Sequence, residues 1–272
     1  MEKIVQDMKT VDRRSDLSYE TFISQYAIPG KPVIIAGAMD DWRATKLWNT
    51  EFFRTQYGSK KVTISRTNSS EKLTVKLSSY IDYMLSKKEQ NPWYLGNWRF
   101  GNDIPELAKD YCVPDYFFDN WMLRLPEPLW SDWKWIFMGP SGSGTSLHCD
   151  VGWSSAWNAL FCGKKKWVFL PPNQSRYVYN GQVDAFNPDF DKYPLFKKAT
   201  PICCTQKPGE IVFTPSVWWH QVYNEGPTIA LTENYVDKTN YKTVLMHLYL
   251  SENHMLYRLL KQFVPKNAPS IS

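Results

Sequence analysis

The sequence lacks the features that mark disulfide-rich secreted proteins and membrane proteins. Its 272 residues include only five cysteines, an odd number with no C-x-x-C pair. Neither a disulfide framework nor a cysteine-based zinc finger is therefore expected. The longest apolar run, around residues 33–39, is far too short to cross a bilayer, and residues 1–14 are too polar for a signal peptide. These absences predict no membrane association and a reducing compartment, the nucleus or the cytoplasm.

A dense run of charge of one sign is also missing. The chain has 32 Lys and Arg against 27 Asp and Glu, a formal net charge of +5. This mild excess suits acidic partners, but it is not the basic stripe of a dedicated nucleic-acid binder. Composition therefore does not indicate nucleic acid as a partner, although it does not exclude RNA.

Aromatic residues, in contrast, are plentiful. The 13 Trp, 16 Tyr and 14 Phe favour a β-rich interior, because these side chains suit pleated, packed surfaces. The chain is also long enough to bury a sizeable core. Most of the rings are expected to be core residues.

The first half of the chain predicts a mixture of short helices and strands. Helices are expected over 17–26, 50–56, 78–85 and 104–111, and strands over 32–36, 61–66, 73–77 and 93–98. From about residue 132, strand patterns follow closely, over 133–138, 145–150, 155–161, 165–170, 209–214, 219–223 and 228–236. Many short strands with turn signals between them, such as a tight turn at Cys162-Gly163, predict an antiparallel sandwich or barrel.

Four segments follow from these patterns. Residues 1–16 are expected to be flexible, 17–130 to form an α/β part that packs on the core, 131–236 to form the β core, and 237–272 to be helical. Within the core, residues 171–208 form an irregular insertion that could act as a lid or binding loop. An apolar stripe in the helical segment favours packing or a homodimer contact; it comprises Met255, Leu256, Leu259, Leu260 and Phe263.

Histidines are scarce, and two of the four lie in the β-rich segment. His148 and Asp150 are two residues apart, so on a strand they point to the same face. His220, from a distant strand, would complete a set of two imidazoles and one carboxylate. Such a set binds one face of a metal ion and leaves its other coordination positions open. Fe(II) or Mn(II) is favoured over structural zinc, and a catalytic zinc site stays open. His247 and His254 fall in the helical tail, where an exposed or capping role is expected.

The residues around this trio resemble the Jumonji-C oxygenases, and the phosphatidylserine-receptor-type lysyl hydroxylase branch most closely. The motifs occur in order and at matching spacing from about residue 30 to 265. They are Asn91-Pro-Trp-Tyr94, Trp135-Ile-Phe-Met-Gly-Pro140, Gly142-Ser-Gly-Thr-Ser-Leu-His148-Cys-Asp150, Ser155-Ala-Trp-Asn-Ala-Leu160, Gly163-Lys-Lys-Lys-Trp167, Lys207-Pro-Gly-Glu-Ile-Val-Phe-Thr-Pro215, Trp218-Trp-His220 and Thr228-Ile-Ala-Leu-Thr-Glu-Asn-Tyr235.

The resemblance implies a double-stranded β-helix, the cupin or jelly-roll fold, with Fe(II) held by His148, Asp150 and His220. It also implies 2-oxoglutarate as co-substrate and O₂ as oxidant. Lys165 would pair with the distal carboxylate of 2-oxoglutarate. Further contacts to metal and co-substrate are implied for Thr232, Thr145, Asn158, Tyr94 and Asn234.

Strand periodicity supports part of this assignment. Lys165 shares a face with Trp167, and Thr232 shares one with Asn234. Thr145 does not share parity with His148, so its inward role requires a bulge or a bend at Gly144.

The implied activity is hydroxylation of a protein or peptide, on a lysyl side chain. Three alternatives remain open: an N-methyl-lysine or N-methyl-arginine demethylase, an RNA-modifying hydroxylase, and a catalytically silent Jumonji-like binding protein. The substrate cannot be read from the sequence.

Overall fold

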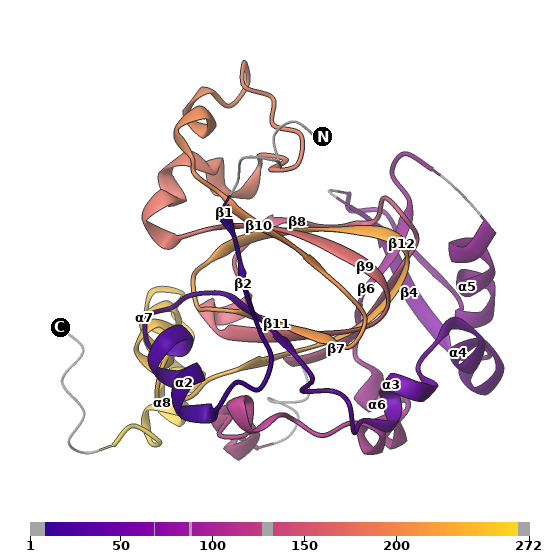
Figure 1. Cartoon of the computed structure of the whole chain (residues 1–272), viewed down its shortest axis with the longest axis horizontal. Helices are drawn as coiled ribbons and strands as arrows, with labels where there is room; N and C mark the ends of the chain where they lie inside the picture. Colours follow the sequence, from indigo (N-terminus) through magenta and orange to yellow (C-terminus); the bar gives the residue numbers. More distant parts are fainter. Residues whose placement is uncertain (1–8, 68, 87–88, 127–132, 266–272) are drawn as a thin grey trace.

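A computed structural model describes residues 9–67, 69–86, 89–126 and 133–265 (Figure 1). Its strands are β1 (Lys9–Thr10), β2 (Asp12–Arg14), β3 (Val33–Ala36), β4 (Lys61–Arg66), β5 (Lys72–Lys76), β6 (Trp93–Trp98), β7 (Lys134–Gly139), β8 (Gly144–His148), β9 (Ser155–Leu170), β10 (Ile202–Gln206), β11 (Glu210–Thr214) and β12 (Trp219–Tyr235). Its α-helices are α2 (Tyr19–Phe22), α3 (Arg43–Leu47), α4 (Thr50–Tyr57), α5 (Leu77–Ser86), α6 (Phe100–Asp103), α7 (Tyr241–Leu250) and α8 (His254–Lys261).

The twelve strands of the described residues form one hydrogen-bonded system that folds over on itself as a jelly roll. One layer has the order β2-β3-β11-β9-β12-β7-β6-β4-β5. The facing layer contains β10 and β8, which pair with the other halves of β9 and β12, and β1, which pairs with β10. The predicted double-stranded β-helix core is confirmed.

Two long bent strands join the layers. Strands β9 and β12 pair antiparallel along almost their whole length, and their register shifts between Glu225 and Ile229. Gly163, at the bend of β9, has φ +74°, and a Cβ there would lie 2.3 Å from the carbonyl oxygen of Pro227. Glycine is required at this bend because the partner backbone approaches so closely. The predicted turn at Cys162-Gly163 and the predicted break between 223 and 228 are thus bends within continuous strands.

The N-terminal residues 9–14 correct another expectation, because they are strands of the sheet. Strand β2 runs parallel to β3, and β1 pairs with β10. Arg13 donates to the carboxylate of Glu210 at 2.9 Å, and the Val11 side chain is buried beside Trp167 and Phe169. The segment is polar in composition, so its role in the sheet was not predicted. The buried Val11 side chain and the Arg13–Glu210 ion pair hold it against the sheet. Residues 1–8 lie outside the described part of the chain.

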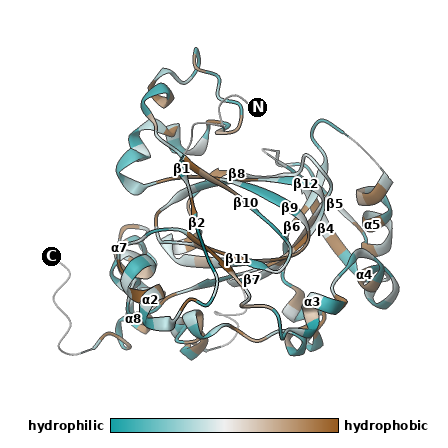
Figure 2. Cartoon of the chain, viewed as in Figure 1, coloured by the Kyte–Doolittle hydropathy of each residue, from teal (hydrophilic) through white to brown (hydrophobic). Residues whose placement is uncertain are grey.

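Helices cover the ends and one face of the sheet. Residues 17–26, predicted as one helix, form α2 and then a π-helical turn, η1 (Ile23–Ala27), and the helix predicted over 104–111 is the 3₁₀ helix η2 (Pro105–Asp110). The outer helices carry both hydrophilic and hydrophobic segments in Figure 2, as expected where only one face is buried. No helix among the described residues is both long and hydrophobic enough to cross a membrane.

The segment 171–208 is only partly irregular. It contains the 3₁₀ helices η7 (Pro172–Tyr177), η8 (Tyr179–Gly181) and η9 (Pro194–Lys198), and it ends in strand β10, which was not predicted. A small apolar cluster, including Val178 and Phe196, attaches the segment to β8 and β9. Its role as a lid stays a prediction.

The C-terminal stripe packs mainly within the chain. Leu256 and Leu260 are buried in a cluster with Trp121 and residues of α7, whereas Met255 is 61% exposed. The homodimer stays a prediction, as does the division into four segments. The predicted boundary between residues 130 and 131 lies outside the described residues. Strands β3 and β6, from the expected N-terminal part, belong to the same sheet as the core.

Candidate active site

A cavity of about 410 Å³ opens between the two layers of the jelly roll. Every site residue predicted from the sequence lines it: His148, Asp150, His220, Lys165, Thr232, Thr145, Asn158, Tyr94 and Asn234. These residues come from four separate strands and one turn, so the fold alone brings them together.

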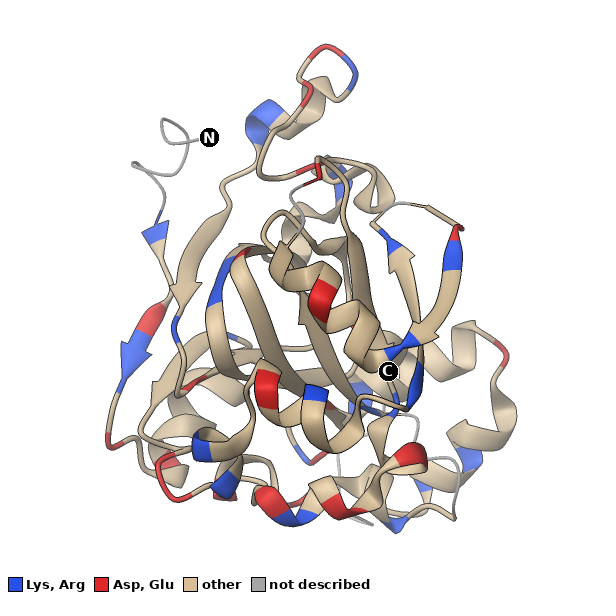
Figure 3. Ribbon diagram, turned by 90° about the vertical axis from the view of Figure 1, so that its right-hand side faces the viewer, with Lys and Arg blue, Asp and Glu red and all other residues tan. Residues whose placement is uncertain are grey.

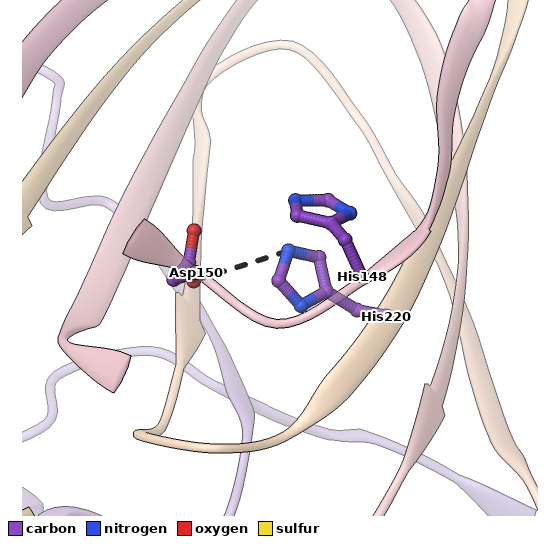
Figure 4. A group of neighbouring side chains, drawn as sticks. All are labelled: His148, Asp150 and His220. Atoms are coloured by element: carbon purple, nitrogen blue, oxygen red, sulfur yellow. Dashed lines mark ion pairs between the residues drawn. The ribbon is translucent and has the colours of Figure 1, made fainter. Parts of the chain in front are cut away.

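Two strands and a turn position the metal-binding candidates. His148 is the last residue of β8, and His220 lies opposite it near the start of β12. The strand predicted over 145–150 ends at His148, and Asp150 precedes the 3₁₀ turn η6 (Val151–Trp153). The backbone at Asp150 is still extended, with φ −62° and ψ 156°. The expected alternation therefore persists past the end of the strand, and all three side chains point to a common centre (Figure 4).

The three side chains have the geometry of a metal site. One ligand atom from each lies within 4.8 Å of the others. The Nδ1 atom of His148 is 2.7 Å from the carbonyl oxygen of Ser146, and that of His220 is 3.1 Å from the carbonyl oxygen of Trp218. A carbonyl only accepts, so each Nδ1 carries the proton and each Nε2 presents a lone pair.

Asp150 shows what such a centre requires. Its Oδ2 atom is buried and has no hydrogen-bond partner among the described residues. It lies 3.9 Å from Nε2 of His220, the contact dashed in Figure 4. Burial and the neighbouring His148 lower the pKa of His220 to about 4, so this imidazole is neutral near pH 7. A neutral imidazole does not compensate a buried carboxylate, but a divalent cation does. The residues present therefore fit an iron(II) ion.

The turn after Asp150 is held in a strained conformation. Trp153 has φ 54°, in the left-handed region that bulky residues rarely adopt, and its ring lies 4.9 Å from that of His247 on α7. His247 therefore supports the back of this turn, whereas His254 is exposed at the start of α8. Neither belongs to the three-residue centre.

Lys165 lies at the closed end of the cavity and has no anionic partner among the described residues. Its side chain is 1% exposed, and Nζ donates to Oδ1 of Asn224 at 2.9 Å. Burial lowers the pKa of Lys165 to about 7. Asp150 is the sole acidic residue that lines the cavity in the described part of the chain. A buried lysine directed into a cavity without a counter-ion is arranged to meet a carboxylate from outside the chain.

Polar side chains surround the space between Lys165 and the metal-binding candidates. Asn158 donates to the hydroxyl of Thr232 at 2.6 Å, and its own Oδ1 is buried without a partner among the described residues. Asn234 donates to Ser154 instead. Burial raises the pKa of the Tyr94 phenol, and hydrogen bonds with Thr145 and Asn224 oppose that rise. The phenol is therefore a neutral hydrogen-bonding group at the closed end.

The irregularity expected near Thr145 is present. His220 pairs with His148 and Val222 with Thr145, so β8 has one residue more than β12 in this interval. A bulge of one extra residue reverses the alternation of side chains, so Thr145 lies on the same face of β8 as His148. Both residues line the cavity. The extra residue lies between Thr145 and His148 rather than at Gly144.

Asn224 and the outer rim of the cavity were not predicted from the sequence. Asn224 is fully buried, links Lys165 to the hydroxyl of Ser143, and shares the parity of His220. Extending the alternation from His220 would have found it. The rim residues Arg66 and Asn97 come from β4 and β6. Only the tertiary fold brings them to the cavity, so no local pattern identified them.

Comparisons with known proteins agree with this geometry. The model of the cupin-like domain matches residues 19–241. The chain is 33% identical to the bifunctional arginine demethylase and lysyl-hydroxylase psr-1 of Caenorhabditis elegans, a match that covers 91% of this chain and 67% of that protein. It is 30% identical to the 2-oxoglutarate and iron-dependent oxygenase JMJD4 of Gallus gallus, over 85% of this chain and 60% of the relative.

A third relative is longer than this chain. The lysine-specific demethylase JMJ21 of Arabidopsis thaliana is 35% identical over 91% of the chain, which spans only 28% of JMJ21. For the arginine-specific demethylase JMJ20 the chain spans 56%. The region matched by the family model, residues 19–241, contains the cavity and its three candidate ligands. The chain therefore belongs to the cupin-like, Jumonji-C family of iron- and 2-oxoglutarate-dependent oxygenases.

Proposed function

We propose that this protein is an iron(II)- and 2-oxoglutarate-dependent protein hydroxylase that acts on a lysyl side chain. The observation that carries the proposal is that Lys165, a buried lysine with no acidic counter-ion among the described residues, lines the same cavity as His148, Asp150 and His220. A dicarboxylate that binds a metal at one end needs a cation at the other. This cavity offers both.

Each lining residue has a task in holding the co-substrate. Lys165 pairs with the distal carboxylate, and Asn224 keeps the ammonium group directed into the cavity. Tyr94 and Thr145 provide hydroxyl groups at the same end. Asn158, whose Oδ1 is unpaired, and Thr232 lie between that end and the metal ligands, and Asn234 contributes a further amide.

His148, Asp150 and His220 would hold the iron, and a set of two imidazoles and one carboxylate would leave it able to take further ligands from outside the chain. The bound iron supplies oxidative chemistry in which 2-oxoglutarate and O₂ give succinate and CO₂, and one oxygen atom enters a substrate C–H bond. The rings of Trp167 and Phe169 stack 5.5 Å apart and flank His220, which excludes water from that side.

A protein substrate is supported by the names of the relatives, which include a lysyl-hydroxylase and several demethylases. Demethylation of N-methyl-lysine or N-methyl-arginine is the second candidate, because psr-1 is named for both activities. The catalytically silent alternative is disfavoured, since a binding protein has no need of a cavity whose buried lysine lacks an acidic counter-ion and whose buried Asp150 Oδ2 lacks a hydrogen-bond partner among the described residues. We place the protein in the nucleus or cytoplasm.

Mass spectrometry separates these reactions. The protein is incubated with Fe(II), 2-oxoglutarate, ascorbate and a set of unmodified and methylated lysyl and arginyl peptides. Hydroxylation adds about 16 Da to an unmodified peptide, whereas demethylation removes about 14 Da from a methylated one. Only the first outcome on a lysyl peptide supports the proposal, and mass loss confined to methylated peptides would replace it with the demethylase assignment.

A further inference from the structure

One face of the β4–β5 hairpin is a basic surface that continues the wall of the cavity. Lys61, Thr63 and Ser65 alternate along β4 on one face. Their direct partners on β5 are Lys76, Thr74 and Lys72. The hydroxyls of Thr63 and Thr74 lie 3.2 Å apart, in agreement with this shared face. We call these six residues the basic strand face.

The basic strand face leads into the active site. Ser65 lines the cavity, and it pairs with Tyr94 on β6, which lines the cavity too. The opposite face of the hairpin is occupied, because Val62 and Ile64 are buried against the helices α4 and α5. The side that bears the lysines therefore faces the same way as the mouth of the cavity. Figure 1 shows the helices on the outside of this part of the sheet.

The three lysines are not neutralised by any of the described residues. Lys61, Lys72 and Lys76 are exposed, and none has an ion pair or side-chain hydrogen bond within the described residues. The nearby Glu71 and Glu89 pair with Arg66 instead, at 3.4 and 3.0 Å. Basic and acidic residues are otherwise interspersed over this side of the molecule (Figure 3).

The cross-strand pairing of two lysines lowers the stability of the folded chain. Lys61 and Lys76 stand directly opposite each other, and like charges in that position destabilise an antiparallel pair. A ligand that brings negative charge between them removes this repulsion. We infer that the basic strand face binds an acidic, extended segment of the protein substrate next to the residue that enters the cavity. This inference rests on the proposed function and names its substrate class.

The spacing of the strands sets where the acidic residues fall. Lys72 is one strand away from Ser65, about 5 Å, and Lys61 is four residues along β4, about 13 Å. An extended peptide advances about 3.3 Å per residue. Acidic side chains are thus expected roughly two to five positions from the target residue.

A peptide fits this surface better than nucleic acid does. Sequence-tolerant binding of single strands combines basic groups with aromatic rings on which bases stack. The basic strand face contains lysine, threonine and serine but no ring. Trp93 pairs with Arg66, so it has the other parity, and its ring is covered by that guanidinium at 4.5 Å.

The test compares two triple variants of the full chain loaded with Mn(II) and 2-oxoglutarate. The first is Lys61→Gln, Lys72→Gln, Lys76→Gln; the matched control is Lys31→Gln, Lys46→Gln, Lys109→Gln, three exposed lysines away from the cavity. The probe is a fluorescent peptide of about 15 residues with one central lysine and glutamates two to five positions from it. Its comparison ligands are the same peptide with glutamines and a single-stranded RNA of equal charge.

Wild type and the control variant are expected to bind the glutamate peptide about tenfold more tightly than the glutamine peptide, and the first variant is expected to lose this preference. Higher salt should weaken only the preferred binding. Equal affinity of wild type for both peptides, or an unchanged preference in the first variant, overturns the inference. Tighter lysine-dependent binding of the RNA overturns it as well and assigns the surface to nucleic acid.

Two further measurements keep the result unambiguous. The first variant should melt no lower than wild type, because it removes like-charge repulsion, and its affinity for 2-oxoglutarate should be unchanged. If the wild-type protein did not bind 2-oxoglutarate, the proposed function itself would be refuted. A Lys72→Glu, Lys76→Glu variant should prefer a peptide with lysines in place of glutamates; if it still prefers the glutamate peptide, the inference is wrong.

Discussion

The closed end and the mouth of the cavity are built in different ways. At the closed end, Lys165 and Asn224 are fully buried and bonded to each other, so their positions are fixed before any ligand binds. At the mouth, Asn97 is exposed, and the Arg66 side chain is 26% exposed and shared between two glutamates. A fixed, anion-seeking end suits one small co-substrate, whereas an exposed, polar rim suits selection among larger substrates. Changes at the two ends should therefore have separable effects.

The largest effect is expected at the metal ligands. Asp150→Ala removes the one carboxylate of the centre and should abolish 2-oxoglutarate turnover, with or without substrate. Mn(II) binding, followed by electron paramagnetic resonance, should be lost in parallel. Cys149→Ser is the matched control: Cys149 Sγ contacts the carbonyl of Val217 rather than the cavity, so turnover should stay within about twofold. Unchanged turnover in Asp150→Ala would refute the iron assignment.

Lys165→Ala should come next in magnitude. Truncating one partner of a buried charge pair leaves the other unpaired, so the Kd for 2-oxoglutarate should rise about a hundredfold. Lys164→Ala should change it less than about twofold, because Lys164 is exposed. Calorimetric titration of both variants measures this. If the two variants raised the Kd for 2-oxoglutarate equally, Lys165 would not be the lysine that pairs with its distal carboxylate.

A pH dependence should accompany 2-oxoglutarate binding. Burial lowers the pKa of Lys165 from its ordinary value of 10.5 to about 7. The lysine is charged below about pH 7, and above that pH it must take up a proton to meet the carboxylate. Affinity should then fall up to about tenfold per pH unit.

Titrations in buffers of different ionisation enthalpy measure this uptake. About one proton should be bound per 2-oxoglutarate near pH 8.5 and almost none near pH 6. The same lowered pKa makes folding stability depend on pH, because the unfolded chain binds one more proton than the folded chain between about pH 7 and 10.5. The contribution of Lys165 to stability therefore rises with pH across that window. Absence of proton uptake near pH 8.5 would show that Lys165 is not the group that meets the carboxylate.

The smallest effect on the co-substrate is expected at the mouth. Arg66→Gln should leave 2-oxoglutarate turnover without substrate within about twofold, because Arg66 is at the rim and already paired with Glu71 and Glu89. The KM for a peptide substrate should change more than kcat does. If Arg66→Gln and Lys165→Ala weaken 2-oxoglutarate binding equally, the two ends of the cavity are not separable.

The residues at the closed end of the cavity could be predicted from the sequence more completely than those at its mouth. The alternation of strands correctly placed Lys165 with Trp167 and Thr232 with Asn234, because parity depends only on local backbone geometry. It could not foresee that β9 and β12 stay continuous through Gly163 and Gly226, since the bend depends on how the two layers close. The strands at residues 9–14 were missed because their partners, β3 and β10, lie far away in the sequence. Arg66 and Asn97 were missed for the same reason.

The most direct test of the account is whether the metal and Lys165 hold one and the same molecule. Binding of 2-oxoglutarate is measured by calorimetry in wild type, with and without Mn(II), and in Asp150→Ala and Lys165→Ala. The account predicts that removing the metal, Asp150 or Lys165 each weakens binding strongly, and that succinate, which has no keto group, gains much less from the metal. Affinity for 2-oxoglutarate that is unchanged by removal of either the metal or Lys165 would contradict it.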